Sequence, residues 1–146
     1  MSPDEHAHSI TPVLVLGMAR NGTTWMGNLL AGHNAIAAAG HFLHHGVHES
    51  NILLNKRYWG NLGPVDNYIN FIHCYSSEDY FKLAAGDVDY FLSHRQENFF
   101  QFFFELMDQF AAKNNLGMWT TKLDPLFYIH TKEREFFFLE LFARYM

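Results

Sequence analysis

Pro12-Val13-Leu14-Val15-Leu16, followed by Gly17-Met18-Ala19-Arg20-Asn21-Gly22-Thr23-Thr24-Trp25, is the stretch that decides the fold. Its first five residues form a short apolar run, partly β-branched and closed by glycine, which is typical of a strand buried on both faces in a parallel sheet. Residues 23–33 then place Trp25, Met26, Leu29, Leu30 and His33 at helical spacing, after a Gly- and Thr-rich start that favours turns and N-caps. Strand, glycine loop and helix in this order predict the opening of an α/β domain.

The rest of the chain adds a few further elements. The patterns predict a short strand at 36–40, an irregular stretch at 51–70, a helix that begins with Ser77 as its N-cap, an amphipathic helix at 98–114, a strand at 118–122 and a helix at 133–146. We therefore expect a P-loop-like, three-layer α/β domain with a parallel sheet at residues 12–146, after a flexible tail at 1–11. About three strands are fewer than such sheets usually contain, so we expect an incomplete, N-terminal portion of the domain, truncated at its C-terminus.

The amino-acid composition limits the classes of protein to which the chain could belong. Hydrophobic residues make up 49% of the 146 residues, which supports a packed core, and the net charge of −5 argues against a nucleic-acid binder. Cys74 is the only cysteine, so no internal disulfide can form, and a reducing compartment fits best. The polar, acidic N-terminus does not resemble a secretion signal, and no apolar run approaches the ~20 residues of a membrane span. These features predict a soluble, cytoplasmic protein.

The glycine loop has the spacing of a nucleotide-binding P-loop, with one difference. Thr23 occupies the position of the P-loop lysine, and the nearby cation is Arg20. The glycines still let successive N–H groups turn toward an anion, and the following helix offers its positive N-terminal end. Without the lysine that reaches a triphosphate, the loop suits one phosphate plus one sulfate better than a nucleoside triphosphate with magnesium. The candidate binding residues are Arg20, Asn21, Gly22, Thr23, Thr24 and Trp25.

This loop resembles the 5′-phosphosulfate loop of the sulfotransferase family. Arg20, Gly22, Thr23, Thr24 and Trp25 match that loop, whereas Asn21 replaces its usual Ser. The segments 28–33 (NLLAGH) and 44–50 (HHGVHES) are similar to segments of bacterial members. Residues 119–122 (WTTK) lie where the family often has a Trp followed by a Lys that faces the sulfonate.

The resemblance implies a reaction and a set of roles. The donor would be 3′-phosphoadenosine 5′-phosphosulfate (PAPS), and the acceptor a hydroxyl or amine of a small molecule or carbohydrate. Arg20, Lys122 and the loop amides would stabilise the bridging oxygen, without a required metal. An acceptor hydroxyl must lose a proton, for which His45 and Glu49 are candidate bases. The family's 3′-phosphate site, an Arg and a Ser on the next strand and helix, would follow residue 146.

Two other classes remain open. A P-loop nucleotide kinase or NTPase would need a Lys after Gly22 and an acidic, magnesium-binding strand end, and neither is evident. A non-catalytic sulfotransferase-like fragment, or an interaction module, would keep the loop but lack the 3′-phosphate site. We expect Lys122 to be catalytic by resemblance, although a surface lysine at a strand end fits the sequence equally well.

Clusters of other residue types have simpler interpretations. The histidines at 41, 44, 45 and 48 could hold zinc on a helix, but Gly40 and Gly46 favour a polar loop at the mouth of the site. The phenylalanine-rich stretches at 99–104 and 136–142, together with Trp25 and Trp119, are expected to pack in the core. If the Phe-rich helices are partly exposed, we expect copies of the chain to associate through them.

Overall fold

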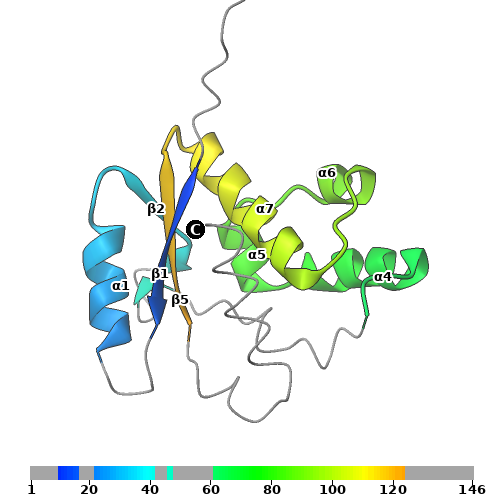
Figure 1. The fold of residues 1–146 in the computed structure, drawn as a ribbon, viewed down its shortest axis with the longest axis horizontal. Helices are drawn as coiled ribbons and strands as arrows, with labels where there is room; N and C mark the ends of the chain where they lie inside the picture. Colours follow the sequence, from blue (N-terminus) through cyan, green and yellow to red (C-terminus); the bar gives the residue numbers. More distant parts are fainter. Residues whose placement is uncertain (1–9, 17–21, 42–45, 48–60, 124–146) are drawn as a thin grey trace, which may run out of the picture.

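A computed structural model describes residues 10–16, 22–41, 46–47 and 61–123 (Figure 1). Three strands form a parallel sheet in the order β1-β5-β2, with β1 at Thr11–Leu16, β2 at Ile36–Ala38 and β5 at Met118–Leu123. A separate antiparallel pair joins β3 (Gly40–His41) and β4 (Gly46–Val47). The protein is therefore a mixed α/β structure with a small parallel sheet.

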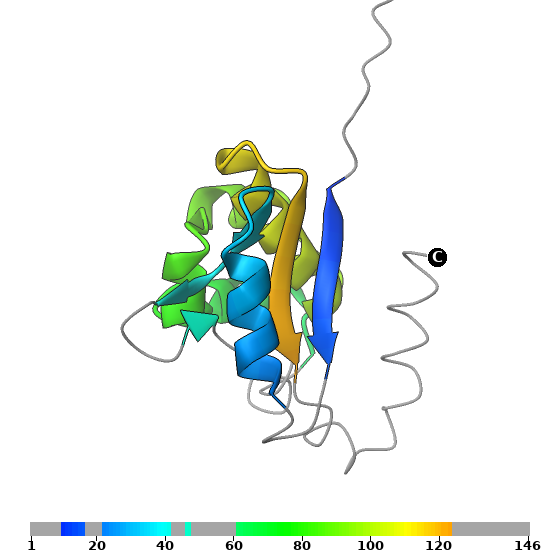
Figure 2. The same ribbon diagram turned by 90° about the vertical axis from the view of Figure 1, so that its left-hand side faces the viewer.

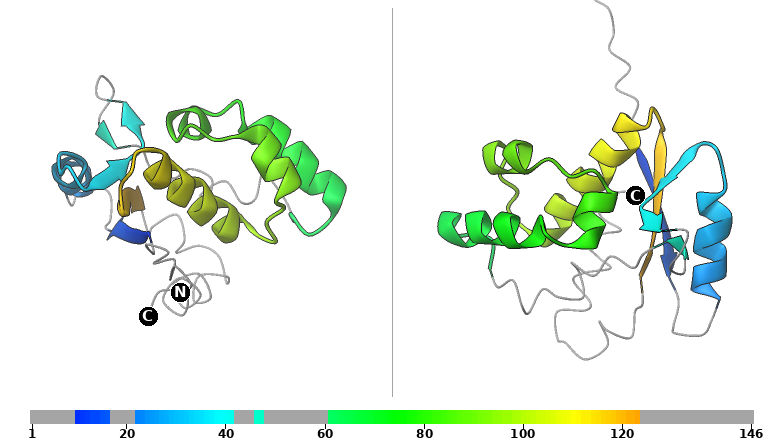
Figure 3. Two further views of the ribbon diagram at one scale, coloured as in Figure 1. Left: turned by 90° about the horizontal axis from the view of Figure 1, so that it is seen from above. Right: turned by 180° about the vertical axis from the view of Figure 1, so that it is seen from behind.

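Helices cover the two faces of this sheet. The helix α1 (Thr23–Ala31) lies on one face, and α7 (Phe99–Lys113) lies on the other, where it packs chiefly on β5 and β2 (Figure 2; Figure 3, left). The shorter helices α4 (Val65–Tyr75), α5 (Asp79–Leu83) and α6 (Val88–Ser93) lie on the α7 side (Figure 1). The chain passes from β1 through α1 to β2, and β5 returns later to pair between them.

Side chains of β5 alternate between the two faces of the sheet, so this strand contacts helices on both sides. Trp119 is fully buried against Phe103 and Phe104 of α7, and its Nε1 donates a hydrogen bond to Asp108 Oδ1 at 2.6 Å. Lys122, which projects from the opposite face, bonds to a residue of α1. Because successive side chains of a strand point to opposite faces, this central strand carries both the core and the α1 face.

The main core is aromatic and lies between the sheet and the helices of the α7 side. Phe102 is fully buried at its centre, with ring centroids 4.5 Å from Phe91, 4.9 Å from Phe71 and 5.7 Å from Tyr75. Such edge-on and tilted pairs add to the stabilisation that burial of each ring provides. The phenylalanines that are described as buried on α7 are Phe99, Phe102, Phe103 and Phe104. These rings are therefore not available for the self-association that an exposed α7 would allow.

The structure confirms several predicted elements. The strand predicted before the glycine loop is β1, and the strand predicted at 118–122 is β5. Helix α7 matches the helix predicted at 98–114 to within one residue at each end. Asn115 takes a left-handed φ of 55° at the end of α7, as expected for Asn after a helix. The helix predicted to reach His33 ends at Ala31. The helix expected at 133–146 lies outside the described residues.

Two predictions for the helical half were wrong. The irregular stretch was predicted to extend to residue 70. Residues 61–64 are irregular, but α4 begins at Val65. Tyr68, Phe71, Ile72 and Tyr75 are buried along one face of α4, so an i, i+3, i+4, i+7 pattern follows the Asn- and Gly-rich segment directly. Ser77 is not the N-cap of α5, because Glu78 occupies that position and makes no side-chain cap bond.

Candidate functional site

The N-terminal end of α1 is built around a glycine in a left-handed conformation. Gly22 has φ 81° at the N-cap position, and its carbonyl accepts the first helical hydrogen bond, from the Met26 N–H at 3.0 Å. Gly22 has no side chain with which to cap this end, and the first turn of α1 holds no acidic residue. The N-cap residue therefore supplies no side-chain oxygen to the first N–H groups of α1, which form the positive end of the helix dipole.

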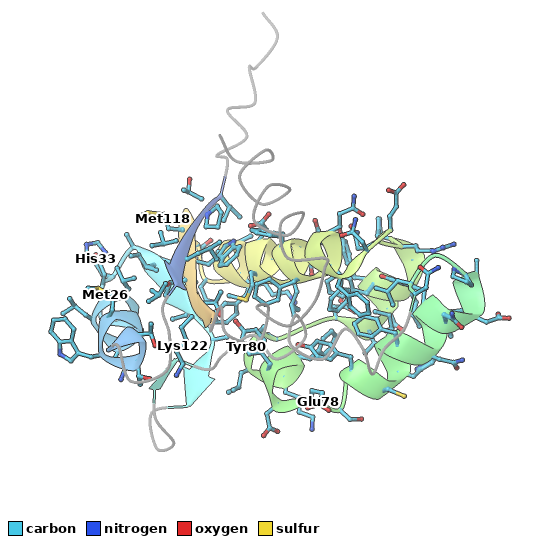
Figure 4. The ribbon with its side chains drawn as sticks, turned by 60° about the horizontal axis from the view of Figure 1, so that its bottom comes forward. Met26, His33, Glu78, Tyr80, Met118 and Lys122 are labelled. Carbon is cyan, nitrogen blue, oxygen red and sulfur yellow. The ribbon has the colours of Figure 1, made fainter. Side chains whose placement is uncertain are left out.

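Lys122 brings a cation to this end of α1. Its Nζ donates a hydrogen bond to Thr24 Oγ1 at 3.0 Å, and the side chain is only 8% exposed. Lys122 pairs in register with Val15, one residue before the ends of β5 and β1. Figure 4 shows Lys122 at the end of β5 beside α1, with Tyr80 across the strand. The site thus lies at the carboxyl ends of two adjacent parallel strands, where ligands of open α/β sheets commonly bind.

Charge is distributed unevenly over the described residues. Every carboxylate among them belongs to the helical part at residues 66–108, and these are Asp66, Glu78, Asp79, Asp87, Asp89, Glu97, Glu105 and Asp108. The described parts of β1, α1, β2 and β5 hold no carboxylate, and Lys122 is a cation. A buried ammonium beside the N-terminus of a helix, at the carboxyl ends of two parallel strands, favours an anionic ligand over a metal cation.

Hydrogen bonds on both faces hold β5 at this edge. Thr120 Oγ1 donates to the Val13 carbonyl at 2.8 Å, and the Tyr80 hydroxyl donates to Thr121 Oγ1 at 3.1 Å. Burial raises the pKa of Tyr80 far above its ordinary value, with a smaller opposing contribution from the Thr121 bond. Tyr80 therefore stays a neutral donor throughout the physiological pH range, and the backbone that carries Lys122 is fixed from both sides.

The structure places some of the predicted site residues and leaves others outside its described part. Gly22, Thr23, Thr24 and Trp25 form the start of α1, and Thr24 meets Lys122 as described above. Arg20, Asn21, His45 and Glu49 lie outside the described residues. The direct bond between Thr24 and Lys122 was not predicted, because sequence spacing does not show which residue of the loop a strand-end lysine reaches.

Trp25 does not pack in the core as predicted. Its side chain is 66% exposed, and Met26 and Leu29 of the same helix are also exposed. Gly27 is the buried residue of α1, so the helix approaches the sheet through its smallest residue, and Trp25, Met26 and Leu29 point outward. Trp119, by contrast, is fully buried, which confirms the prediction for that residue.

Of the four clustered histidines, the structure describes one. His41 belongs to the short strand β3, whereas His44, His45 and His48 lie outside the described residues. Among the residues that are described, no three potential metal ligands come together. In the same part of the chain, no helix has the length and hydropathy to cross a bilayer.

Comparison of the chain with protein-family models, with curated proteins and with solved structures found no match in any of the three. The resemblance of the loop to sulfotransferases therefore rests on the sequence alone.

Gly22 provides a direct test of the loop conformation. A Cβ added there would meet no atom within 4 Å, so the cost of Gly22→Ala comes from the left-handed φ alone. We expect Gly22→Ala to lower the free energy of unfolding by about 1–2 kcal/mol, measured by urea denaturation. Gly117→Ala is the matched control, because a Cβ there also meets no atom within 4 Å and Gly117 has no positive φ. Equal stabilities for the two variants would contradict the left-handed turn.

Proposed function

We propose that this protein is a sulfotransferase, which binds PAPS at the carboxyl ends of β1 and β5 and transfers its sulfonate to a hydroxyl or amine acceptor. The observation that carries the proposal is the hydrogen bond from the buried Lys122 to Thr24, which joins a cation to the first turn of α1. Together with the resemblance of residues 20–25 to a phosphosulfate loop, this arrangement supports a site for adjacent phosphate and sulfate groups.

The proposed chemistry is an in-line substitution at sulfur. The acceptor oxygen or nitrogen forms a bond to the sulfonate sulfur, while the bond from sulfur to the bridging oxygen of the donor breaks. Negative charge then builds on the bridging oxygen, where Lys122, Arg20 and the first amides of α1 stabilise it. The acceptor proton passes to a base, for which His45 and Glu49 are the candidates. The products are a sulfonated small molecule or carbohydrate and adenosine 3′,5′-bisphosphate.

Two further features support this donor over a nucleoside triphosphate. Thr23 stands where an NTPase has the lysine that reaches a triphosphate. The exposed indole of Trp25, in the first turn of α1, provides a flat apolar surface beside the anion site. Such a ring can stack on the adenine of the donor, which gives Trp25 a role in the proposed site.

Calorimetric titration with adenosine 3′,5′-bisphosphate tests the proposal. We expect binding that is unchanged when magnesium is added or chelated, and that is weakened in Arg20→Ala. Dependence on magnesium, with a preference for ATP, would instead indicate the kinase or NTPase class. Lack of binding at millimolar bisphosphate would contradict the proposed site. Binding without transfer to any acceptor would identify a non-catalytic, sulfotransferase-like module.

A further inference from the structure

The end of β5 that carries Lys122 lies beyond the pairing of this strand with β2. The ladder between β5 and β2 ends at the pair of Thr120 with Ala38, whereas the ladder between β5 and β1 continues to Leu123. Thr121 and Lys122 therefore pair with β1 on one edge, and their other edge lies past the last β2 pair. Because strand ends open more readily than strand centres, side-chain bonds at this end decide how firmly Lys122 is held.

The Tyr80 side chain of α5 contacts the first residue past that last pair. Its hydroxyl donates to Thr121 Oγ1 at 3.1 Å and lies 3.5 Å from Met107 Sδ of α7. The ring is buried and packs against Phe103 of α7, with ring centroids 5.8 Å apart. Since α7 fixes the ring, the aromatic core sets the position of the donor that holds Thr121.

This contact reaches the ammonium of Lys122 through the backbone of β5. Tyr80 and Lys122 lie on opposite sides of the end of β5 (Figure 4). A displacement of Thr121 moves the backbone of Lys122, and the 3.0 Å bond from Lys122 Nζ to Thr24 Oγ1 depends on that backbone. We propose that Tyr80 is a positioning residue, which acts through Thr121 to hold the Lys122 ammonium at the first turn of α1. The consequence for donor binding rests on the proposed function, whereas the placement of Lys122 does not.

Chemical labelling of Lys122 in the ligand-free protein tests this positioning. Limited acetylation with an N-hydroxysuccinimide ester, followed by peptide mass spectrometry, compares Lys122 with the exposed Lys82 as an internal reference. In Tyr80→Phe we expect the relative labelling of Lys122 to rise by about 2–10-fold, the factor that corresponds to the loss of one ordinary hydrogen bond. The rise follows because a less firmly held ammonium leaves Thr24 more often and becomes accessible to the reagent.

Tyr68→Phe is the matched control for Tyr80→Phe. Tyr68 is also buried, and its hydroxyl donates to the Phe91 carbonyl at 3.0 Å within the helical part of the molecule. Its loss should lower the stability comparably, as urea denaturation measures, and leave the relative labelling of Lys122 unchanged. An equal rise of Lys122 labelling in both variants, or no rise in Tyr80→Phe, would overturn the proposal.

Thr121→Val removes the acceptor of the same hydrogen bond and keeps the shape of the side chain. It should raise the relative labelling of Lys122 as Tyr80→Phe does, and it tests the same bond if Tyr80→Phe does not fold. The double variant should show no larger rise than either single variant, because both substitutions remove one interaction. Additive rises would indicate two independent effects and overturn the proposal.

Calorimetry with adenosine 3′,5′-bisphosphate measures the consequence for the proposed donor site. We expect Tyr80→Phe to weaken binding by about 2–10-fold and Tyr68→Phe to leave it unchanged. If Tyr80→Phe raises Lys122 labelling but the unmodified protein does not bind the bisphosphate, the proposed function fails and the positioning of Lys122 stands. If binding and labelling in Tyr80→Phe both equal those of the unmodified protein, the positioning is overturned and the proposed function stands.

Discussion

Replacing Lys122 with Met is expected to weaken binding of adenosine 3′,5′-bisphosphate by about 10–100-fold, because hydrogen bonds to charged groups contribute about 1.5–3 kcal/mol. The change removes the ammonium that lies beside the start of α1, and it keeps a side chain of similar length. The free energy of unfolding should stay the same or rise, since an apolar side chain often replaces a buried charge without loss. Calorimetry measures the affinity, and urea denaturation measures the stability.

A second lysine provides the matched control. Lys82 is exposed on α5, in the helical part of the molecule, so Lys82→Met removes one positive charge without touching the carboxyl edge of the sheet. Its affinity for the bisphosphate should equal that of the unmodified protein. If both lysine variants lose affinity to the same extent, the effect is one of net charge, and Lys122 has no place in the site.

Replacing Phe102 with Ala is expected to lower the free energy of unfolding by about 3–5 kcal/mol, the usual cost of removing a fully buried aromatic ring. The ring is fully buried and contacts Phe71 and Phe91 closely, so its removal leaves a cavity in the aromatic core. Urea denaturation, followed by far-ultraviolet circular dichroism, measures the change.

Phe110 of the same helix is the comparison for this prediction. It is only partly buried at the margin of the aromatic core, so Phe110→Ala should cost clearly less than Phe102→Ala. Equal losses for the two variants would show that α7 is not packed through Phe102 as described.

The elements that could be predicted from the sequence are those whose pattern is local. The apolar run at 12–16 and the 98–114 periodicity each specify one element, and both appear with boundaries close to those expected. Helix α4 was not predicted, because the Asn and Gly residues before it led us to expect irregular structure up to residue 70. The helical spacing of its buried residues is nevertheless present in the sequence. Strand order could not be predicted, since the pairing of β5 between β1 and β2 depends on contacts between distant residues.

The candidate site was predictable in its residue types and not in its contacts. The sequence predicted a glycine turn before α1 and left Lys122 open between a catalytic and a surface lysine, and the structure shows a left-handed Gly22 and a buried Lys122. The Lys122 bond to Thr24 requires the register of β5 with β1, which no local pattern encodes. Trp25 was placed in the core on hydrophobicity alone. Its exposure follows from Gly27, which brings α1 close to the sheet on another side of the helix.

The location of the proposed anion site is tested most directly by amide chemical shifts. Titration of isotopically labelled protein with adenosine 3′,5′-bisphosphate, with adenosine as the control ligand, reports each residue separately. We predict that Gly22, Thr23 and Thr24 at the start of α1 and Lys122 at the end of β5 shift more strongly with the bisphosphate than with adenosine, whereas α4 to α6 shift with neither. Shifts confined to the helical part, or none at millimolar ligand, would contradict an anion site at this edge of the sheet.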